Sequence, residues 1–203
     1  MRLIVLSAPD HLVDEAAVIN GLFEAGMDLF HIRKPHSGIA EVRTLIEGID
    51  PAYHHLLVLH QHHVLCDAFG LTRRHYPEAL RQQQDAQCFA DLQQQGIRLS
   101  TSIHHLQSLP GLSAFEYVFF SPVFNSISKV GYYSKLAAEF KCSSIPGFPA
   151  VFALGGISAD NIAEVSAMNF DGVGVLGAIW NMGQCPLDNF RLVQRACQVL
   201  QSL

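Results

Sequence analysis

Ser102 and His104, two residues apart, are the pair in this chain best suited to moving a proton. They follow the apolar, strand-like stretch at 96–100. An imidazole accepts and releases a proton near neutral pH, and a serine hydroxyl can orient a substrate or the ring itself. The spacing therefore predicts catalytic roles for both residues. The alternative is that Ser102 caps a helix and that His104 is solvated.

A cationic pair, Arg33 and Lys34, directly follows the apolar run 29–32. A guanidinium binds carboxylates and phosphates in a bidentate manner, and an ammonium adds a second positive charge. We therefore expect both side chains to hold an anionic group of a substrate. The alternative is an ordinary surface pair at the exit of a strand.

Two hydroxyls and an ammonium follow the apolar run 117–124. Ser126 and Ser128 stand at alternate positions, so their hydroxyls can face the same way, and Lys129 comes next. Together these groups can grip a phosphate or a carboxylate. The alternative is an ordinary serine-rich loop.

Two β-type runs near the C-terminus end in glycine. Gly155 and Gly156 end the first run, and Gly174, Leu176 and Gly177 lie at the end of the second. Because glycine has no Cβ, backbone N–H groups can approach an oxyanion closely at such ends. The pattern predicts a phosphate-binding site made from these two strand ends.

The chain contains eleven histidines, of which the densest group lies at 60–63. Adjacent histidines cannot easily share one metal on a regular element, and no cysteine or carboxylate stands at a helpful spacing. We therefore expect no metal ligands here. His31, His60, Gln61 and His75 fall at or near the ends of apolar runs and are candidates for lining a pocket.

Eight apolar runs alternate with helical patterns, which predicts a parallel sheet covered by helices, and eight strands can close a barrel. The predicted strands are 3–7, 28–33, 56–60, 71–75, 96–100, 117–121, 150–154 and 172–176. The predicted helices include 13–24, 40–49, 86–95, 161–168 and 189–200. We expect one (β/α)8 TIM barrel over residues 1–203, with short connecting helices because the chain is short for this fold. An open doubly wound sheet is the alternative.

Composition narrows the class of protein. Hydrophobic residues make up 49% of the chain and charged residues 15%, which predicts a folded domain with a large core. The net charge is −5 and the basic residues are scattered, so no nucleic-acid surface is expected. No apolar run reaches the roughly 18 residues of a membrane span. The five cysteines are far apart, which indicates free thiols in a reducing cytoplasm, and a homo-oligomer is compatible with the sequence.

In their order and spacing, these residues resemble the thiamine-phosphate synthase family and its TenI-type thiazole tautomerase relatives, over nearly the whole chain. The resemblance places Arg33 on the family's pyrophosphate-binding arginine and Ser102-Ile103-His104 on its Ser-x-His motif. It matches 117–124 and 126–129 to the family's Gly-Pro-[Ile/Val]-[Tyr/Phe] strand and Thr-x-Thr-Lys loop, and 154–157 and 172–179 to its phosphate-binding strand ends.

The resemblance implies a thiamine-biosynthesis enzyme, first of all a transferase of the thiamine-phosphate synthase type. Such an enzyme couples hydroxymethylpyrimidine diphosphate to thiazole phosphate and releases pyrophosphate with help from Mg²⁺, and Arg33 would neutralise part of the leaving charge. Family members hold the metal with two aspartates. The first corresponds here to Gln61, only Glu78 lies near the second, and Pro35 replaces a lysine. Mg²⁺ is therefore expected only if the synthase reaction is retained.

A TenI-type tautomerase is the main alternative, and it needs no metal. It moves a proton on a thiazole phosphate carboxylate, and the resemblance gives the acid–base role to His104. A non-catalytic barrel that binds thiazole phosphate is a third interpretation. A sugar-phosphate epimerase is a fourth, although the catalytic carboxylates expected at its strand ends are missing. The expected partners are phosphorylated small molecules, with no nucleic acid and no membrane.

Overall fold

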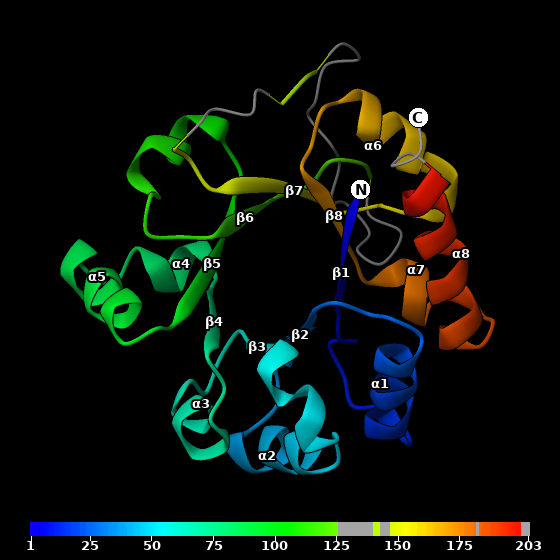
Figure 1. Ribbon diagram of the computed structural model, residues 1–203, viewed down its shortest axis with the longest axis horizontal. Coiled ribbons are helices and arrows are strands. Elements are labelled where there is room, and N and C mark those ends of the chain that lie inside the picture. Colours follow the sequence, from blue (N-terminus) through cyan, green and yellow to red (C-terminus); the bar gives the residue numbers. More distant parts are fainter. Residues whose placement is uncertain (126–139, 143–146, 182, 200–203) are drawn as a thin grey trace.

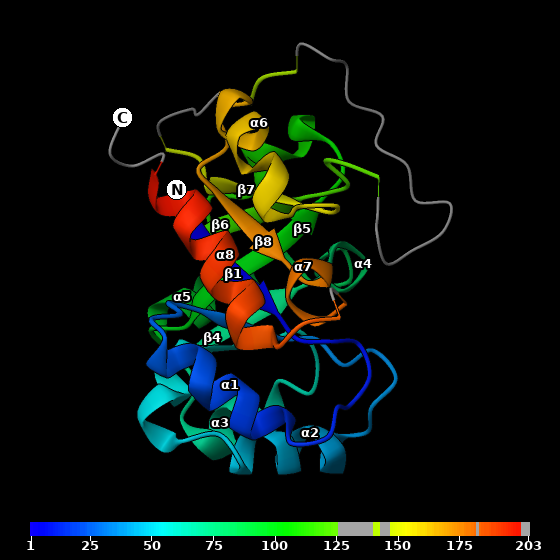
Figure 2. The same ribbon diagram turned by 90° about the vertical axis from the view of Figure 1, so that its right-hand side faces the viewer.

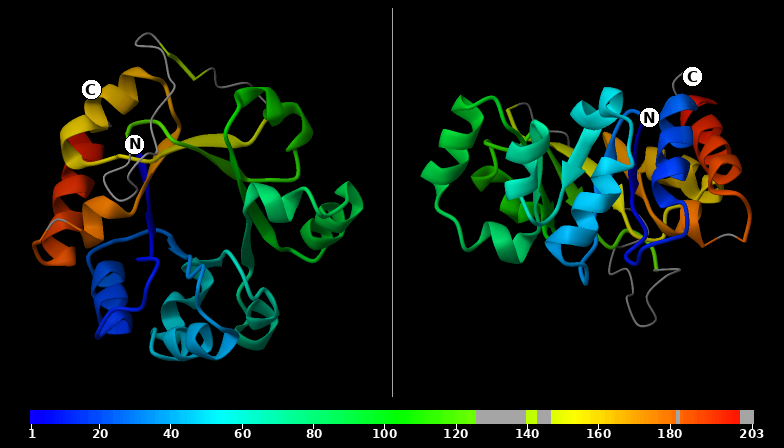
Figure 3. Two further views of the ribbon diagram at one scale, coloured as in Figure 1. Left: turned by 180° about the vertical axis from the view of Figure 1, so that it is seen from behind. Right: turned by 90° about the horizontal axis from the view of Figure 1, so that it is seen from below.

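Eight parallel strands close into a barrel, in chain order, with the last strand paired to the first. The computed structural model describes residues 1–125, 140–142, 147–181 and 183–199. The strands are β1 (Arg2–Leu6), β2 (Phe30–Ile32), β3 (Leu57–Leu59), β4 (Arg73–Tyr76), β5 (Arg98–Ile103), β6 (Tyr117–Phe120), β7 (Ala150–Leu154) and β8 (Gly172–Val175). Figure 1 shows them around a ring, and Figure 3 shows the ring from behind. The predicted (β/α)8 barrel is confirmed, and the sheet is not open.

The helices lie outside the strands, as Figures 1 and 2 show. They are α1 (Glu15–Glu24), α2 (Ile39–Glu47), η1 (Pro51–Leu56), α3 (Val64–Phe69), α4 (Glu78–Arg81), α5 (Ala86–Gln94), η2 (Leu106–Gly111), η3 (Ala159–Asn161), α6 (Ile162–Ala167), α7 (Gly177–Trp180) and α8 (Pro186–Val199). The five predicted helices correspond to α1, α2, α5, α6 and α8, whereas α3, α4 and α7, of six, four and four residues, were not predicted. None of the helices in the described ranges is long and apolar enough to cross a bilayer.

Alternation along the strands decides which side chains face the barrel interior. The interior apolar cluster consists of Ile4, Leu6, Leu29, Val58, Tyr117, Phe119 and Phe152. A second and larger cluster, which includes Ile32, fills the space between the barrel and the helices. Since side chains alternate with a period of two, His31 and Arg33 share the interior face of Leu29. Lys34 falls on the opposite face, with Ile32.

The strand predicted at 71–75 forms slightly further along the chain, as β4. Its first two residues are arginines, and both are paired with carboxylates. Arg73 lies 3.2 Å from Glu116, and Arg74 lies 2.6 Å from Asp67. The next two residues are buried. Ion pairs at the start of the strand thus allow a charged sequence to complete the barrel.

The connection between β6 and β7 lies largely outside the described residues, so the irregular structure predicted for 122–149 is only partly tested. Its first residues return to β7, because the N–H groups of Val123 and Phe124 donate to the carbonyls of Leu154 and Gly155, each at 3.0 Å. This contact brings the loop after β6 against the end of β7.

Candidate functional site

A cavity of about 520 Å³ opens at the carboxyl ends of the strands. Every strand contributes to its lining, either with its last residues or with the loop that follows. Barrels of this type carry their active sites at this end. Of the predicted site residues, the cavity brings together Arg33, His60, Ser102, His104, Gly155, Gly156, Gly174, Leu176 and Gly177.

His104 lies directly after β5 at the cavity wall. Its ring nitrogen Nδ1 donates a hydrogen bond to the backbone carbonyl of Ser121, at 2.7 Å. Because a carbonyl can only accept, the neutral ring carries its proton on Nδ1 and a lone pair on Nε2. Nε2 lies 3.8 Å from Oε2 of Glu78. A basic nitrogen and a carboxylate that can stabilise its protonated form therefore face each other.

Ser102 belongs to β5, so it is not a helix cap. Its hydroxyl lies 3.0 Å from Nε2 of His75, while Nδ1 of the same ring lies 2.9 Å from the hydroxyl of Ser100. His75 pairs with Ser100 in the β4–β5 register, so the three groups are neighbours across two strands. Ser102 thus connects the cavity to a buried histidine.

Arg33 lines the cavity just beyond the end of β2. Two hydrogen bonds with the Ser7 hydroxyl fix its backbone: the Arg33 N–H donates at 2.9 Å, and the hydroxyl donates to the Arg33 carbonyl at 3.1 Å. Burial lowers the pKa of Arg33, but a guanidinium remains charged near neutral pH. No carboxylate among the described residues pairs with it, so it is available to an anion.

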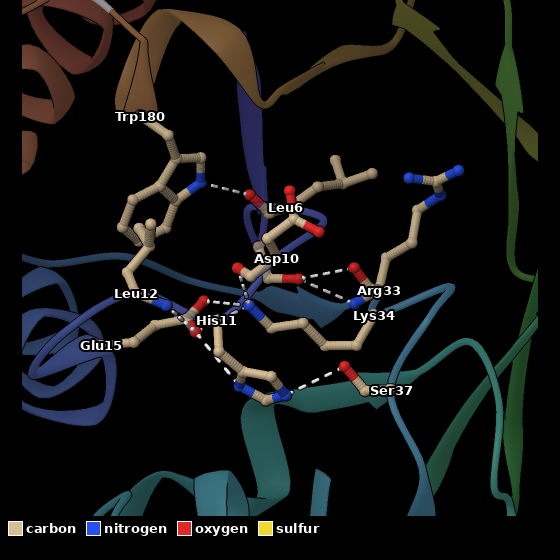
Figure 4. A network of polar contacts seen from close by, with 10 residues as sticks. Leu6, Asp10, His11, Leu12, Glu15, Arg33, Lys34, Ser37 and Trp180 are labelled. Carbon is tan, nitrogen blue, oxygen red and sulfur yellow. Dashed lines mark hydrogen bonds and ion pairs between the residues drawn. The ribbon is translucent and has the colours of Figure 1, made fainter. Parts of the chain in front are cut away.

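Lys34 does not line the cavity, and the structure corrects its predicted place beside Arg33. Its side chain is fully buried, and Nζ donates to both carboxylate oxygens of Glu15 at 2.6 Å and to the Asp10 carbonyl at 2.7 Å. Figure 4 shows the Lys34 side chain among these acceptors, while the guanidinium of Arg33 extends away from them. Strand alternation explains the difference, because adjacent residues face opposite sides. Lys34 therefore stabilises the fold around α1.

The turn at Gly155 and Gly156 requires glycine. Both residues have positive φ, +97° and +68°. A Cβ on Gly156 would lie 2.5 Å from the carbonyl oxygen of Asn125, so the loop after β6 leaves no room for one. Neither N–H group donates a hydrogen bond within the described chain. Two backbone donors thus remain for an anion at the cavity wall.

The second glycine-marked end combines two roles. Gly174 lines the cavity, but a Cβ there would lie 2.8 Å from the Phe119 ring, so its small size serves interior packing. Leu176 and Gly177 follow it at the start of α7, where the first N–H groups have no intrahelical acceptor. Ser126, Ser128 and Lys129, predicted to complete this anion site, lie outside the described residues.

The predicted pocket histidines lie deeper than expected. His31 and His75 are fully buried, and of the three only His60 lines the cavity. Burial, aided by nearby positive groups, lowers the pKa of His75 to about 3 and the pKa of His31 and His60 well below their ordinary value. These rings are neutral at physiological pH. Gln61 turns away, since its amide donates to the Lys34 carbonyl.

The residues present do not fit the Mg²⁺ ion that the family resemblance implies. Gln61 is neutral, and its amide is already bonded to backbone. The carboxylate of Glu78 pairs with Arg81 at 3.1 Å and faces His104. No second carboxylate lies in the described cavity lining. Because Mg²⁺ prefers carboxylate oxygens, this site lacks the donor set that it requires.

Several lining residues were not expected from the sequence. Pro77, Ala79 and Gln82 come from the segment around α4, which is too short to give a periodic signal. Ser121 contributes its backbone carbonyl, a group that every residue carries. Glu78 was noted only as an acid near a metal position. No sequence pattern marks any of these contacts.

Solved structures with the same fold include two thiamine phosphate pyrophosphorylases. Thiamine phosphate pyrophosphorylase from Bacteroides thetaiotaomicron is similar with a TM-score of 0.74 and 25% identity, over 98% of each chain. Its counterpart from Pyrococcus furiosus has a TM-score of 0.70 and 17% identity, over 98% of this chain and 96% of that one. A 3-hexulose-6-phosphate synthase from Salmonella typhimurium shares the barrel, with a TM-score of 0.61 and 15% identity over 98% and 99%. A search of curated proteins finds no match.

A family model described as TMP-TENI, thiamine monophosphate synthase, matches residues 3–179. That span is most of the 203-residue chain and includes every residue that lines the cavity. The family resemblance drawn from the sequence motifs is confirmed: the chain belongs to the thiamine monophosphate synthase family.

Proposed function

We propose that the protein is a thiamine-biosynthesis enzyme that moves a proton on a thiazole phosphate carboxylate, with His104 as acid and base. The observation that carries this proposal is the orientation of the His104 ring. Nδ1 is held by the Ser121 carbonyl at 2.7 Å, so Nε2 is the basic nitrogen. A neutral imidazole in a fixed tautomer is what proton abstraction near neutral pH requires.

In the proposed reaction, Nε2 of His104 takes a proton from one carbon of the substrate and returns it to another. Glu78, 3.8 Å away, stabilises the imidazolium between the two steps. The Ser102 hydroxyl positions the substrate in the same wall of the cavity. The proton stays within the isomerising molecule, so the step needs no oxidant, leaving group or metal.

We assign the two anionic ends of the substrate to different parts of the cavity. The carboxylate lies against Arg33, whose charge no carboxylate of the described residues neutralises. The phosphate lies against the N–H groups of Gly155, Gly156 and Gly177. Ser126, Ser128 and Lys129 complete this anion site in the proposal, as their spacing predicts.

Thiamine-phosphate synthase activity is the second candidate. The description of the matching family and the pyrophosphorylase from Bacteroides thetaiotaomicron favour it. Arg33 would then neutralise charge on the leaving pyrophosphate. The poor fit of Gln61 and Glu78 to Mg²⁺ makes proton transfer the better-supported function. For either reaction we place the protein in the cytoplasm, since all five cysteines are free, and we expect small phosphorylated partners.

Two assays on one preparation test the proposal. Chelator-treated protein is given thiazole phosphate carboxylate, and isomerisation is followed by NMR. The same protein receives thiazole phosphate, hydroxymethylpyrimidine diphosphate and Mg²⁺, and thiamine phosphate is measured. The proposal expects isomerisation without metal and no thiamine phosphate.

Each of the other results identifies a different function. Thiamine phosphate without isomerisation would replace the proposal with the synthase. If both assays fail while thiazole phosphate still raises the melting temperature, the protein is a binding barrel only.

A further inference from the structure

Three histidines from neighbouring strands meet inside the barrel next to the cavity. His31 lies in β2, His60 directly follows β3, and His75 lies in β4. One ring nitrogen of each lies within 4.8 Å of the other two. The three residues are 0%, 5% and 0% exposed. We call them the tri-histidine cluster.

We propose that the tri-histidine cluster binds one divalent transition-metal ion of the zinc type. The histidines at 60–63 argued against a metal in the sequence, because adjacent residues on one element cannot easily share an ion. The barrel removes that objection by gathering donors from three separate strands. Of the other histidines in this stretch, His62 points to the Ser37 carbonyl at 2.9 Å and His63 to the Leu59 carbonyl at 3.0 Å.

The ring nitrogens of the cluster are close enough for side-chain rotation alone to bring them around one ion. Nδ1 of His31 and Nε2 of His60 lie 2.9 Å apart. Two imidazoles on a tetrahedral Zn²⁺, with Zn–N of about 2.0–2.1 Å, place their nitrogens about 3.3 Å apart. The rings of His60 and His75 are stacked with centroids 3.9 Å apart, and His31 meets both edge-on. To coordinate one ion, the stacked rings of His60 and His75 would rotate until their lone pairs converge, and Nε2 of His75 would exchange its contact with the Ser102 hydroxyl, at 3.0 Å, for the ion.

Hydrogen bonds at the far side of two rings match those of metal-binding histidines. A ligating imidazole almost always donates its second N–H to a neighbouring group, which fixes the ring. The hydroxyl of Tyr117 lies 2.6 Å from Nε2 of His31. The hydroxyl of Ser100 lies 2.9 Å from Nδ1 of His75. Both partners are buried, so the rings are oriented before any ion arrives.

The donor atoms of the cluster select the type of ion. Burial keeps all three rings neutral, the form in which imidazole binds metals. The cluster contains no carboxylate, and Arg33 and Arg73 are close enough to lower the pKa of its members. Hard ions such as Mg²⁺ and Ca²⁺ require oxygen donors and are disfavoured. Zn²⁺, Co²⁺ and Ni²⁺ bind imidazole well and suit this set.

The proposed ion would lie at the edge of the cavity, since His60 belongs to both the cluster and the lining. Three protein donors leave a coordination position for water or for a ligand in the cavity. The proposed metal site does not include His104, although its ligand His75 lies 3.0 Å from the hydroxyl of Ser102. Its test therefore measures the metal alone and stands whichever reaction the enzyme performs.

Metal titration of tag-free, chelator-treated protein tests the proposal. Co²⁺ is followed by its visible ligand-field absorption, and Zn²⁺ by competition with a chromophoric chelator. We expect one equivalent per chain and no competition by Mg²⁺. His60→Gln or His75→Asn should weaken Zn²⁺ binding by more than about 100-fold, since each removes a ligand, whereas the control His62→Asn should bind like the unaltered protein.

Loss of Zn²⁺ binding in the ligand variants could come from misfolding, so two further variants keep all three histidines. Tyr117→Phe removes only the hydroxyl beside His31, and Ser100→Ala removes only the hydroxyl beside His75. Each should weaken Zn²⁺ binding by about tenfold in a protein with an unchanged circular dichroism spectrum. Binding well below one equivalent, or binding abolished by His62→Asn and retained by the cluster variants, would overturn the proposal.

Discussion

The barrel interior is filled in two different ways on its two sides. On the side of β2 to β5, polar side chains satisfy one another: His31 meets His60 at 2.9 Å, and His75 meets two serines. On the side of β6 to β8, Phe119 and Phe152 fill the space that glycines leave. A Cβ on Gly172 would lie 2.3 Å from the Phe152 ring. We call these the histidine side and the aromatic side.

In the proposed reaction, the histidine side carries the proton transfer and the aromatic side anchors the substrate. The histidine side supplies the side chains that can exchange protons or hold a metal, and it leads to Ser102 and His104 at the cavity. The aromatic side supplies few reactive groups, but its strands end in backbone N–H groups suited to a phosphate. A substrate with a phosphate at one end and a reactive ring at the other would contact both sides.

The largest effect expected on the histidine side concerns His104. Replacement by alanine removes the proposed base, so kcat for isomerisation should fall by about 10²- to 10⁴-fold with little change in melting temperature. His105→Ala is the matched control, because this neighbouring histidine does not line the cavity. Equal activities of the two variants would remove His104 from the mechanism.

Replacing Arg33 and Lys34 one at a time tests whether these adjacent residues have different roles, Arg33 in substrate binding and Lys34 in stability. Lys34→Met removes the ammonium that pairs with the buried carboxylate of Glu15, which keeps the Leu12 N–H at 3.4 Å and His11 at 3.8 Å, and should lower the free energy of unfolding by about 3–5 kcal/mol. Adding Glu15→Gln should restore part of that loss. Arg33→Met should instead raise KM with little loss of stability. Urea unfolding measures the stability of each variant, and steady-state kinetics measures its KM. A Lys34→Met protein that is stable but has a raised KM would show that Lys34, too, binds substrate.

On the aromatic side, Gly172→Ala places a methyl group against Phe152 and near the Arg2 carbonyl. Overpacking of this kind should lower the free energy of unfolding by about 1–3 kcal/mol. Gly21→Ala is the control, since nothing lies within 4 Å of its Cβ position in α1, and it should stabilise by about 0.5–1 kcal/mol. Chemical denaturation of both variants measures their free energies of unfolding. Equal stabilities would contradict the tight packing of Phe152 against Gly172.

Acidity should weaken the histidine side specifically in metal-free protein. Burial lowers the pKa of His75 to about 3 in the folded chain. Below about pH 6.5 this histidine is therefore protonated in the unfolded chain but stays neutral in the folded one. Stability should be full above about pH 6.5 and should fall as the pH drops, by about 1.4 kcal/mol per pH unit for this group. Urea midpoints from pH 7.5 to 5 should show a shallower fall in His75→Asn. If the urea midpoints of the unaltered protein and of His75→Asn fell equally with pH, His75 would not be a buried neutral ring.

The fold was largely predictable from the sequence, because alternation of apolar runs with helical patterns is a local signal. β4 was harder to predict because it begins with two arginines, which are not typical of a buried strand. Their partners, Glu116 and Asp67, lie elsewhere in the sequence, so no local pattern shows that the charges are paired. The helices α4 and α7 have four residues each, too few for a periodic pattern, and α3, with six residues, was also not predicted. Local patterns thus predicted the barrel but not its short segments.

The sequence predicted a site residue correctly only where its distance from the end of a strand was enough to place it at the cavity. Ser102 lies near the end of β5 and His104 directly follows the strand, and both line the cavity. Lys34 was misplaced because the period of two was not applied to it. The tri-histidine cluster joins residues from three strands, and the Ser121 carbonyl has no sequence signature, so neither could be predicted without the closed barrel.

The central claim is that His104 presents a basic Nε2 to the cavity. Nitrogen-15 NMR of histidine-labelled protein, with the His104 resonances assigned from their loss in His104→Ala, measures the tautomer directly. In the neutral ring we predict a proton on Nδ1 and a lone pair on Nε2, whose signal shifts when thiazole phosphate carboxylate is added. A proton on Nε2 in the free protein, with Nδ1 unprotonated, would contradict the account.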